Sequence, residues 1–442
     1  MTGHYFLFFE CMGLLAFHQG QIPRAKRQLG MTVNVIPFFS PISPSQLRVG
    51  MEARLQEVGS RVLSPEEFLS PKSTEGRAIL RQHNSILVGT GGTENMITQF
   101  LARSGLSPPI ILLSHTQSNS LPAAMEVRAY LQKHGISSRI IHAPFSELVK
   151  TVSEWCGFSQ VEERIRESRL AVIGKPSPWL VASTVSTSAV RKRWGTTILD
   201  VQLDELIGLL NKPPSEKTEM AIETFVRGAV CSDVPEEDVK KAGLVSQAME
   251  ELAQKQDLDA LSVECFTLEH KAGISGCCAL SWLNNLQGMV AGCEGDVPAA
   301  FTMMIAKYLT KQPAFLANIA DIDESENSVV AAHCTVPTSI VNAYEITTHF
   351  ETGRSVAIRG QFPLQPVTVM KMWGDDLSQY WVSGGDIKEN LRNETGCRTQ
   401  VRVHLAKPAK QLLEGSLANH HVIVLGDYAN LMERFLAFNA RK

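Results

Sequence analysis

The chain has 442 residues, of which 44% are hydrophobic and 20% are charged, and its formal net charge is −3. This length exceeds one ordinary hydrophobic core, so we expect two or three domains. The charge balance excludes a strongly basic nucleic-acid-binding protein, and no apolar run is long enough to form a membrane-spanning helix. The nine cysteines form no CxxC pair, which favours reduced thiols and a cytoplasmic protein.

Residues 1–30 do not have the pattern of a folded domain. Their apolar stretch, 6–17, is interrupted by Glu10, and basic residues follow it from Arg24 onward. A signal peptide has these features in the reverse order. We interpret 1–30 as a disordered extension or a mis-assigned start that precedes Met31, and a membrane anchor as the weaker alternative.

Strand and helix patterns alternate through the next part of the chain, which indicates a parallel sheet. The predicted strands are 32–38, 85–89, 109–113 and 170–173, and the predicted helices are 45–58, 96–102, 121–133 and 145–168. The glycine-rich segment 89–93 joins a strand to a helix. It has two interpretations: a cradle of backbone N–H groups for an anion, or a tight turn that requires glycine.

The segment 288–337 carries the most functional information. It contains three short apolar runs, each followed by a polar residue, namely Glu294, Asn318 and His333. Continuous apolar runs are typical of buried parallel strands, and ligands bind beyond the carboxyl ends of such strands. We therefore expect these three side chains to converge on one rim.

From about residue 348 the pattern changes to short alternating strands, separated by Gly and Pro and followed by a helix at 430–438. The predicted strands are 356–358, 367–372, 398–405 and 421–425. This predicts a small antiparallel, barrel-like β domain. The expected fold is α/β, with two α/β domains at 31–166 and 167–345 and a C-terminal β domain at 346–442.

Glu294 is the strongest candidate for chemistry. Asp296 fits an N-cap and Pro298 fits the first helical turn, which leaves Glu294 without a structural role beside a glycine. A metal-ligand or acid/base role is favoured over a surface charge.

Two single residues and one adjacent pair keep two interpretations each. His333 is either a site residue or a core histidine bonded to a carbonyl group. His420 and His421 begin a strand and face opposite sides of it, so at most one belongs to any given site. The alternative is one buried and one exposed histidine without a role in a site. Arg398 either holds an anionic or polyhydroxyl ligand or forms a surface salt bridge.

Several short strings occur in a fixed order between residue 31 and the C-terminus. They are Gly91-Gly92-Thr93, Asn119-Ser120 with Glu126, Trp179, Asp259-Ala260 with Cys265-Phe266, Cys293-Glu294-Gly295-Asp296, His333 to Pro337, Cys397 to Gln400, and Asn419-His420. Together they resemble the L-fucose/L-arabinose isomerase superfamily, in particular its shorter fucose-isomerase-like branch.

The resemblance implies two Rossmann-like α/β domains and a C-terminal β domain, in trimers or hexamers with active sites near subunit contacts. It implies isomerisation of aldose to ketose sugars through an enediol, with a divalent metal that is usually Mn²⁺. The implied metal ligands are Glu294, the position of Asn318, His420 and His333, and Glu294 and position 318 are also the implied catalytic positions. The implied substrate-binding residues are Arg398, Asn419 and Cys265.

One position departs from the family pattern, because Asn318 stands where fucose isomerases have a carboxylate. An amide offers a neutral oxygen to a metal but cannot accept a proton as a base, so the site loses a negative charge. A substrate with its own negative charge would compensate for this loss, which is a hypothesis motivated by Asn318 and Arg398. The alternatives are a sugar-binding or regulatory relative, or an epimerase or lyase that uses the same site.

Overall fold

The computed structural model describes residues 33–69, 82–285 and 289–440. The expectation for residues 1–30 lies outside the described residues. None of the helices within the described ranges combines the length and the apolar character that crossing a membrane requires.

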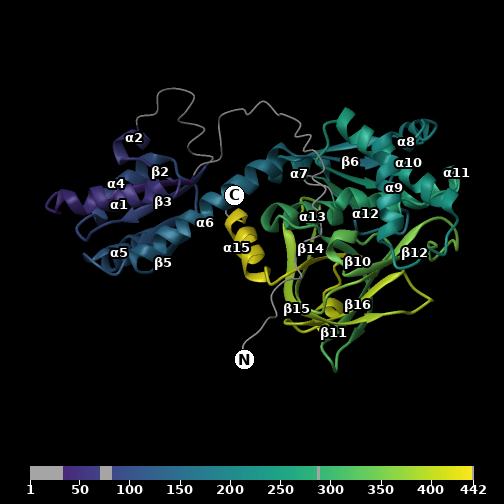
Figure 1. The fold of residues 1–442 in the computed structure, drawn as a ribbon. Coiled ribbons are helices and arrows are strands. Elements are labelled where there is room, and N and C mark those ends of the chain that lie inside the picture. Colours follow the sequence, from purple (N-terminus) through teal and green to yellow (C-terminus); the bar gives the residue numbers. More distant parts are fainter. Residues whose placement is uncertain (1–32, 70–81, 286–288, 441–442) are drawn as a thin grey trace, which may run out of the picture. The chain divides into compact units, whose positions relative to one another are not determined.

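The first α/β unit is built on a parallel sheet with strand order β2-β1-β3-β4-β5 (Figure 1). The strands are β1 (Val33–Phe38), β2 (Arg61–Val62), β3 (His83–Val88), β4 (Ile110–Ser114) and β5 (Ser138–His142). The helices are α1 (Ser45–Glu57), α2 (Pro65–Leu69), α4 (Glu94–Ser104), α5 (Ser120–Lys133) and α6 (Phe145–Glu167). The predicted alternation of strand and helix is confirmed here.

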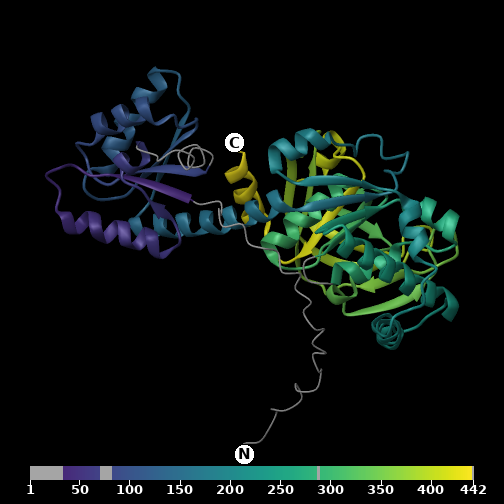
Figure 2. The same cartoon turned by 90° about the horizontal axis from the view of Figure 1, so that it is seen from above.

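The second parallel sheet has the strand order β7-β6-β8-β9, and Figure 2 shows the helices that pack around it. Its strands are β6 (Arg169–Ile173), β7 (Thr197–Val201), β8 (Ala260–Val263) and β9 (Val290–Cys293). The helices of this unit are α7 (Thr187–Trp194), α8 (Leu203–Leu209), α9 (Glu216–Gly228), α10 (Glu236–Lys255), α11 (Cys265–Ala272), α12 (Cys277–Asn285) and α13 (Val297–Thr310).

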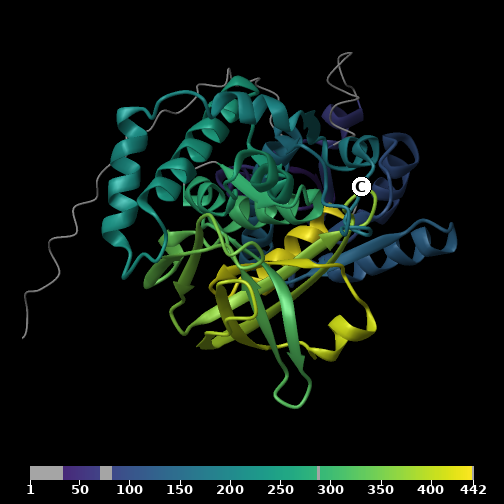
Figure 3. The ribbon, with the colours of Figure 1, turned by 90° about the vertical axis from the view of Figure 1, so that its right-hand side faces the viewer.

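A closed antiparallel barrel follows, with strand order β10-β11-β16-β15-β14-β17 (Figure 3). The strands are β10 (Phe315–Asp323), β11 (Ser328–His333), β14 (Pro366–Trp373), β15 (Gln379–Leu391), β16 (Thr399–Leu405) and β17 (His420–Leu425). The helices α14 (Lys410–Glu414) and α15 (Ala429–Asn439) accompany it. The predicted class, parallel α/β sheets with an antiparallel barrel-like C-terminal part, is confirmed.

The prediction that the second and third apolar runs of 288–337 continue a parallel sheet is wrong. They form β10 and β11, which pair with each other and with β17 and β16 in antiparallel register. A short, continuous apolar run shows only that both faces of a strand are buried, and it does not distinguish a parallel sheet from a covered barrel.

Two further differences concern the C-terminal strands. The predicted strand at 356–358 overlaps β13 (Ala357–Gln361), which pairs with β12 (Ala343–Thr347) outside the barrel. The long strand β15 was not predicted, because its glycines and charged residues break the alternation that marks a half-buried strand.

The helix α13 connects the second sheet with the barrel. It contacts β8 and β9 on the sheet side and β14 and β17 on the barrel side. Residues Val297 to Tyr308 are all buried, as expected for a helix that is apolar around its whole circumference. The N-terminus of α13 therefore lies where the carboxyl end of β9 meets the barrel, and the candidate site forms there.

Candidate metal centre

Glu294 follows β9 in an unusual backbone conformation. Its φ is +61° and that of Gly295 is +68°, so two consecutive residues are left-handed. A Cβ atom on Gly295 would lie 2.7 Å from the carbonyl oxygen of Lys175, which confirms that glycine is needed for close approach. A non-glycine residue held in this region costs of order 1–3 kcal/mol and marks a constrained site.

The carboxylate of Glu294 is oriented by Trp179. The indole N–H of Trp179 donates to Oε2 at 2.6 Å, and the indole packs edge-on against Phe266 with ring centroids 4.9 Å apart. The other oxygen, Oε1, lies 3.8 Å from Nε2 of His420. Since Oε2 is already engaged, Oε1 is the oxygen directed at the histidine.

His420 is the first residue of β17, and its side chain is fully buried. Its Nδ1 lies 2.9 Å from Oδ2 of Asp296. A carboxylate accepts hydrogen bonds, so the imidazole proton belongs on Nδ1 and Nε2 presents a lone pair. Nε2 is buried and has no hydrogen-bond partner among the described residues, which is the condition of a nitrogen prepared for an external ligand.

Asp296 has two roles. Its Oδ1 accepts the backbone N–H of Ala299 at 2.7 Å, so it caps α13 as the sequence predicted. Its Oδ2 orients His420 and lies 3.9 Å from the ammonium group of Lys371. Burial raises the pKa of Asp296, but the Lys371 charge and the His420 hydrogen bond outweigh it and hold the pKa below its usual value.

His333 ends β11 beside these residues. Its Nδ1 lies 2.9 Å from the hydroxyl of Thr335, and its ring centroid lies 5.4 Å from that of His420. Burial, and secondarily the neighbouring His420, lowers the pKa of His333 well below its usual value. A neutral imidazole is the form that binds a metal ion.

Within the described part of the chain, Glu294, His333 and His420 form one group whose ligand atoms all lie within 4.8 Å of one another. One carboxylate and two imidazoles suit a divalent transition metal such as Mn²⁺, Fe²⁺ or Zn²⁺. The Asp296 hydrogen bond to His420 is the orienting contact that metal-binding histidines normally have. These residues therefore fit a divalent metal ion.

Asn318 lies next to this group through strand pairing. It is the register partner of His420 across β10 and β17, and residues directly opposite each other in an antiparallel pair lie on the same face. Its Oδ1 is buried and has no hydrogen-bond partner among the described residues. Its amide oxygen is thus available as a neutral ligand.

The predicted substrate-binding residues have internal partners. Arg398 donates from Nε to the carbonyl oxygen of Thr348 at 2.8 Å, and its other guanidinium nitrogens contact Glu394 and the Thr348 hydroxyl at 3.2 Å. The Cys265 thiol donates to the carbonyl of Val263 at 3.4 Å in the core. Asn419 immediately precedes His420, and its carbonyl oxygen lies 3.3 Å from Nδ1 of His421. Their predicted roles stay predictions.

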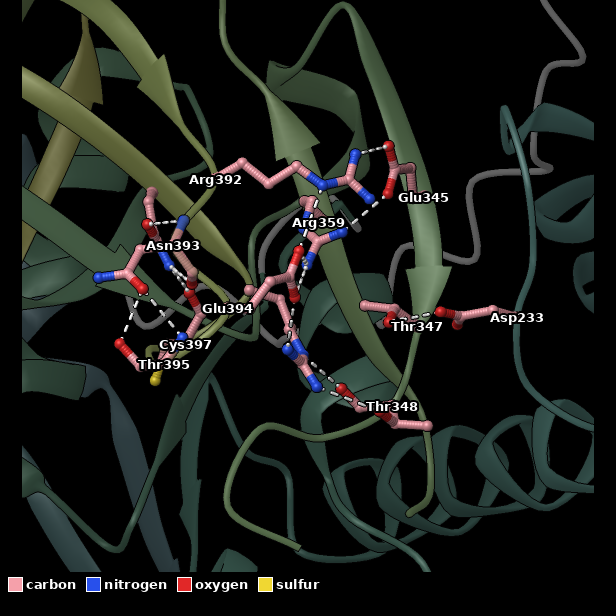
Figure 4. A network of polar contacts seen from close by, with 12 residues as sticks. Asp233, Glu345, Thr347, Thr348, Arg359, Arg392, Asn393, Glu394, Thr395 and Cys397 are labelled. Atoms are coloured by element: carbon pink, nitrogen blue, oxygen red, sulfur yellow. Dashed lines mark hydrogen bonds and ion pairs between the residues drawn. The ribbon is translucent and has the colours of Figure 1, made fainter. Parts of the chain in front are cut away.

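Arg398 forms an ion pair with Glu394, which belongs to the network of polar contacts labelled in Figure 4. Arg359 contacts Glu345 at 3.0 Å and Glu394 at 2.9 Å, and Arg392 contacts the same two carboxylates. The network ties the β12–β13 pair to the β15–β16 connection, residues 392–398, which ends directly before Thr399. It therefore holds in place the segment that carries Arg398.

The side chains of His420 and His421 have different neighbours, as expected of adjacent residues in a strand. His420 joins Glu294 and His333, whereas His421 contacts Trp381, with ring centroids 6.3 Å apart. Both are buried, so the alternative of one exposed histidine is wrong. Burial lowers the pKa of His421 to about 3.

The glycine-rich segment 89–93 has the geometry of a tight turn. Gly91 donates its backbone N–H to Ser118, and a Cβ on Gly91 would lie 2.9 Å from that of Asn119. Gly92 has a φ of +75°. Steric demands of the turn account for both glycines without an anion.

Three contributions to the site had no assigned role in the sequence analysis. They are the hydrogen bond from Trp179 to Glu294, the second role of Asp296, and the buried ammonium of Lys371. For Lys371 a signal exists, because a lysine inside the apolar run Val367 to Trp373 is unusual. For the other two, nothing in the local sequence indicates the partner.

Comparison with known proteins reveals similarity to sugar isomerases. The chain is 25% identical over 279 residues to a sulfoquinovose isomerase of Priestia aryabhattai, an alignment that covers 61% of this chain and 62% of the relative. It is 24% identical over 174 residues to the sulfoquinovose isomerase of Alkalicoccus urumqiensis, or 39% of each chain. That of Clostridium sp. (strain MSTE9) is 23% identical over 270 residues, which are 59% of this chain and 58% of the relative. The aligned part thus spans less than two thirds of the length of each relative, and no family model matches the chain.

Proposed function

We propose that this protein is a metal-dependent aldose–ketose isomerase that acts on a negatively charged sugar. The observation that carries the proposal is the buried group of Glu294, His333 and His420, with a lone pair of His420 directed into it. The similarity to sulfoquinovose isomerases supports the same reaction class independently.

The reaction moves a hydrogen between two adjacent carbons through an enediol. It requires a group that removes a proton from one carbon and returns it to the next, and stabilisation of the negative charge that develops on oxygen. A bound divalent ion such as Mn²⁺ supplies this stabilisation. Glu294, His333 and His420 would hold the ion, with Asn318 as a neutral fourth ligand.

Glu294 is the residue suited to move the proton. Among Glu294, His333, His420 and Asn318, it alone has a carboxylate. Its Oε1 is directed at His420, while its Oε2 accepts the hydrogen bond from Trp179. One base can serve both carbons, because they are adjacent and the proton leaves and returns on the same face of the enediol. Asn318 cannot perform this step, since an amide does not accept a proton at neutral pH.

The choice of an anionic sugar follows from the missing carboxylate at position 318. With Asn318 the site has one negative charge fewer than a site with two carboxylates, so a substrate with its own negative charge meets less repulsion. Sulfoquinovose, the sugar in the names of the relatives, carries a sulfonate group. We therefore propose a sulfonated or similarly anionic aldose as the substrate class.

Asn318 also favours a second candidate, a sugar-binding or regulatory protein that keeps the fold without turnover. The two candidates differ in a direct way. A binding protein leaves the sugar unchanged, whereas an isomerase converts an aldose to a ketose and exchanges hydrogen at the carbon next to the carbonyl with solvent.

The test begins with elemental analysis of the purified protein and titration with Mn²⁺. Sulfoquinovose, glucose and L-fucose are then incubated with the metal-loaded protein in D₂O, and products are followed by NMR. We expect about one Mn²⁺ per chain and ketose formation from sulfoquinovose in preference to the neutral sugars. Binding of sulfoquinovose without conversion would favour the second candidate, and preference for a neutral sugar would refute the anionic substrate.

A further inference from the structure

Lys371 is a buried lysine that no local feature explains. It lies in β14 with its side chain 0% exposed. Its ammonium group has no hydrogen-bond partner among the described residues. Burying an ammonium group is costly unless an opposite charge compensates it, so the position of that charge indicates what Lys371 does.

The compensating charge is Asp296. Nζ of Lys371 lies 3.9 Å from Oδ2 of Asp296, both side chains being fully buried. The same oxygen accepts the hydrogen bond from Nδ1 of His420. His421, whose pKa is lowered by burial and by the Lys371 charge, is an imidazole and offers no negative charge.

We infer that Lys371 acts on the metal centre through Asp296, by cancelling the carboxylate charge behind His420. The cancellation lowers the affinity of the Glu294–His333–His420 group for a divalent cation and makes the loaded site more receptive to an anionic sugar. This inference rests on the proposed function, because it concerns the same site.

A count of buried charges gives the expected direction. Glu294, Asp296 and Lys371 together carry a net charge of −1 when the histidines are neutral. A divalent cation changes this to +1, and a singly charged anionic sugar then brings it to zero. Without Lys371, the loaded site would already be neutral, and the same sugar would leave an uncompensated negative charge.

The test replaces Lys371 in the full chain with methionine, which keeps the length of the side chain and removes its charge. Mn²⁺ affinity is measured by isothermal titration calorimetry and by the loss of the free Mn²⁺ signal in electron paramagnetic resonance. We expect K371M to bind Mn²⁺ more tightly by on the order of tenfold, the size expected for one charge acting over several ångströms of protein. K371R, which keeps the charge, should bind as the wild type does.

Two more variants separate this effect from a general loss of packing. In K371M/D296N the uncompensated charge of the buried Asp296 carboxylate is removed as well, so Mn²⁺ should bind more weakly than in K371M. K307M is the matched control, because Lys307 is also buried but lies near the other end of α13, with Nζ near the carbonyl oxygens of Met289 and Asn284. K307M should leave the Mn²⁺ affinity unchanged.

A further readout is the affinity of the Mn²⁺-loaded protein for sulfoquinovose, which should fall in K371M relative to the wild type. If K371M does not fold, K371Q provides the second charge-deleting variant. Equal or weaker Mn²⁺ binding by the folded charge-deleting variant would overturn the inference while leaving the proposed function intact. A wild-type protein that binds no Mn²⁺ would overturn both.

Discussion

His420 and Asp296 are 124 residues apart in the chain, yet Nδ1 of the histidine lies 2.9 Å from Oδ2 of the aspartate. The carboxylate that caps α13 thus also selects the imidazole tautomer that leaves Nε2 available. Because α13 is buried between the second parallel sheet and the barrel, the orientation of His420 depends on how these two parts pack. A local capping interaction and the metal centre are therefore stabilised by the same residue.

Replacement of Glu294 by glutamine should abolish both metal binding and activity. Glutamine keeps an oxygen to accept the Trp179 N–H but loses the charge and the proton-accepting ability. We expect Mn²⁺ affinity to fall more than about a hundredfold, beyond the range seen when only a supporting residue is changed. Calorimetry measures the affinity, and unchanged binding would show that Glu294 is not a ligand.

Replacement of Asn318 by aspartate should have the opposite effect on the metal. The new carboxylate would lie opposite His420 across β10 and β17 and add a negative charge to the site, so Mn²⁺ should bind on the order of tenfold more tightly. The same charge should weaken the binding of an anionic sugar. If the Mn²⁺ affinity of the aspartate variant equals that of the wild type, Asn318 lies outside the ligand shell.

Replacement of Trp179 by phenylalanine should weaken metal binding by about tenfold, because the carboxylate of Glu294 loses the donor that orients it. The aromatic contact with Phe266 is largely kept. Trp381→Phe is the matched control, since it removes an indole hydrogen bond to Gln411 on the barrel instead. Equal effects of the two substitutions on Mn²⁺ affinity would contradict a role for the Trp179 hydrogen bond.

His421 should make the folded state sensitive to acid. Its pKa is about 3 in the folded protein because of burial and about 6.5 when unfolded. The contribution of a neutral His421 to the free energy of unfolding is therefore fully present above pH 6.5 and is lost as the pH falls toward 3. Between these two pH values only the unfolded state takes up the proton. The cost is about 1.4 kcal/mol per pH unit.

The measurement is the free energy of unfolding of wild type and His421→Gln by urea denaturation between about pH 4 and pH 6. The variant should show the shallower dependence on pH. A substitution at His134, which is exposed, controls for the loss of a histidine as such. Parallel curves for wild type and His421→Gln would refute the prediction.

Two arginines of the network in Figure 4, Arg359 and Arg392, should differ in how much their substitution destabilises the fold. Arg359 and Glu345 have side chains only 10% and 13% exposed, so Arg359→Met leaves the buried Glu345 carboxylate without its buried partner and should destabilise the fold by about 3 kcal/mol. Arg392 contacts the same carboxylates but is 59% exposed, so Arg392→Met should have little effect. Thermal unfolding distinguishes the two, and similar losses would contradict the role of burial.

The sequence alone determined the local features of this protein. The alternation of strand and helix patterns predicted the parallel sheets, and the Asp296–Pro298 pattern predicted the start of α13. The positions of Glu294 and His333 at the ends of apolar runs identified two members of the group, although the expected parallel arrangement of the runs was wrong. Such features depend on residues close in sequence, where periodicity and capping preferences operate.

Only the tertiary structure decided which strands share a sheet and which side chains meet. The pairing of β10 with β17 places Asn318 opposite His420, and the packing of α13 against β14 brings Lys371 to Asp296. These contacts join residues 75 or more positions apart, and their geometry depends on the registers of the barrel strands and on the left-handed turn at Glu294. Local sequence preferences do not predict the strand registers or the turn at Glu294, because both depend on the packing of the whole core.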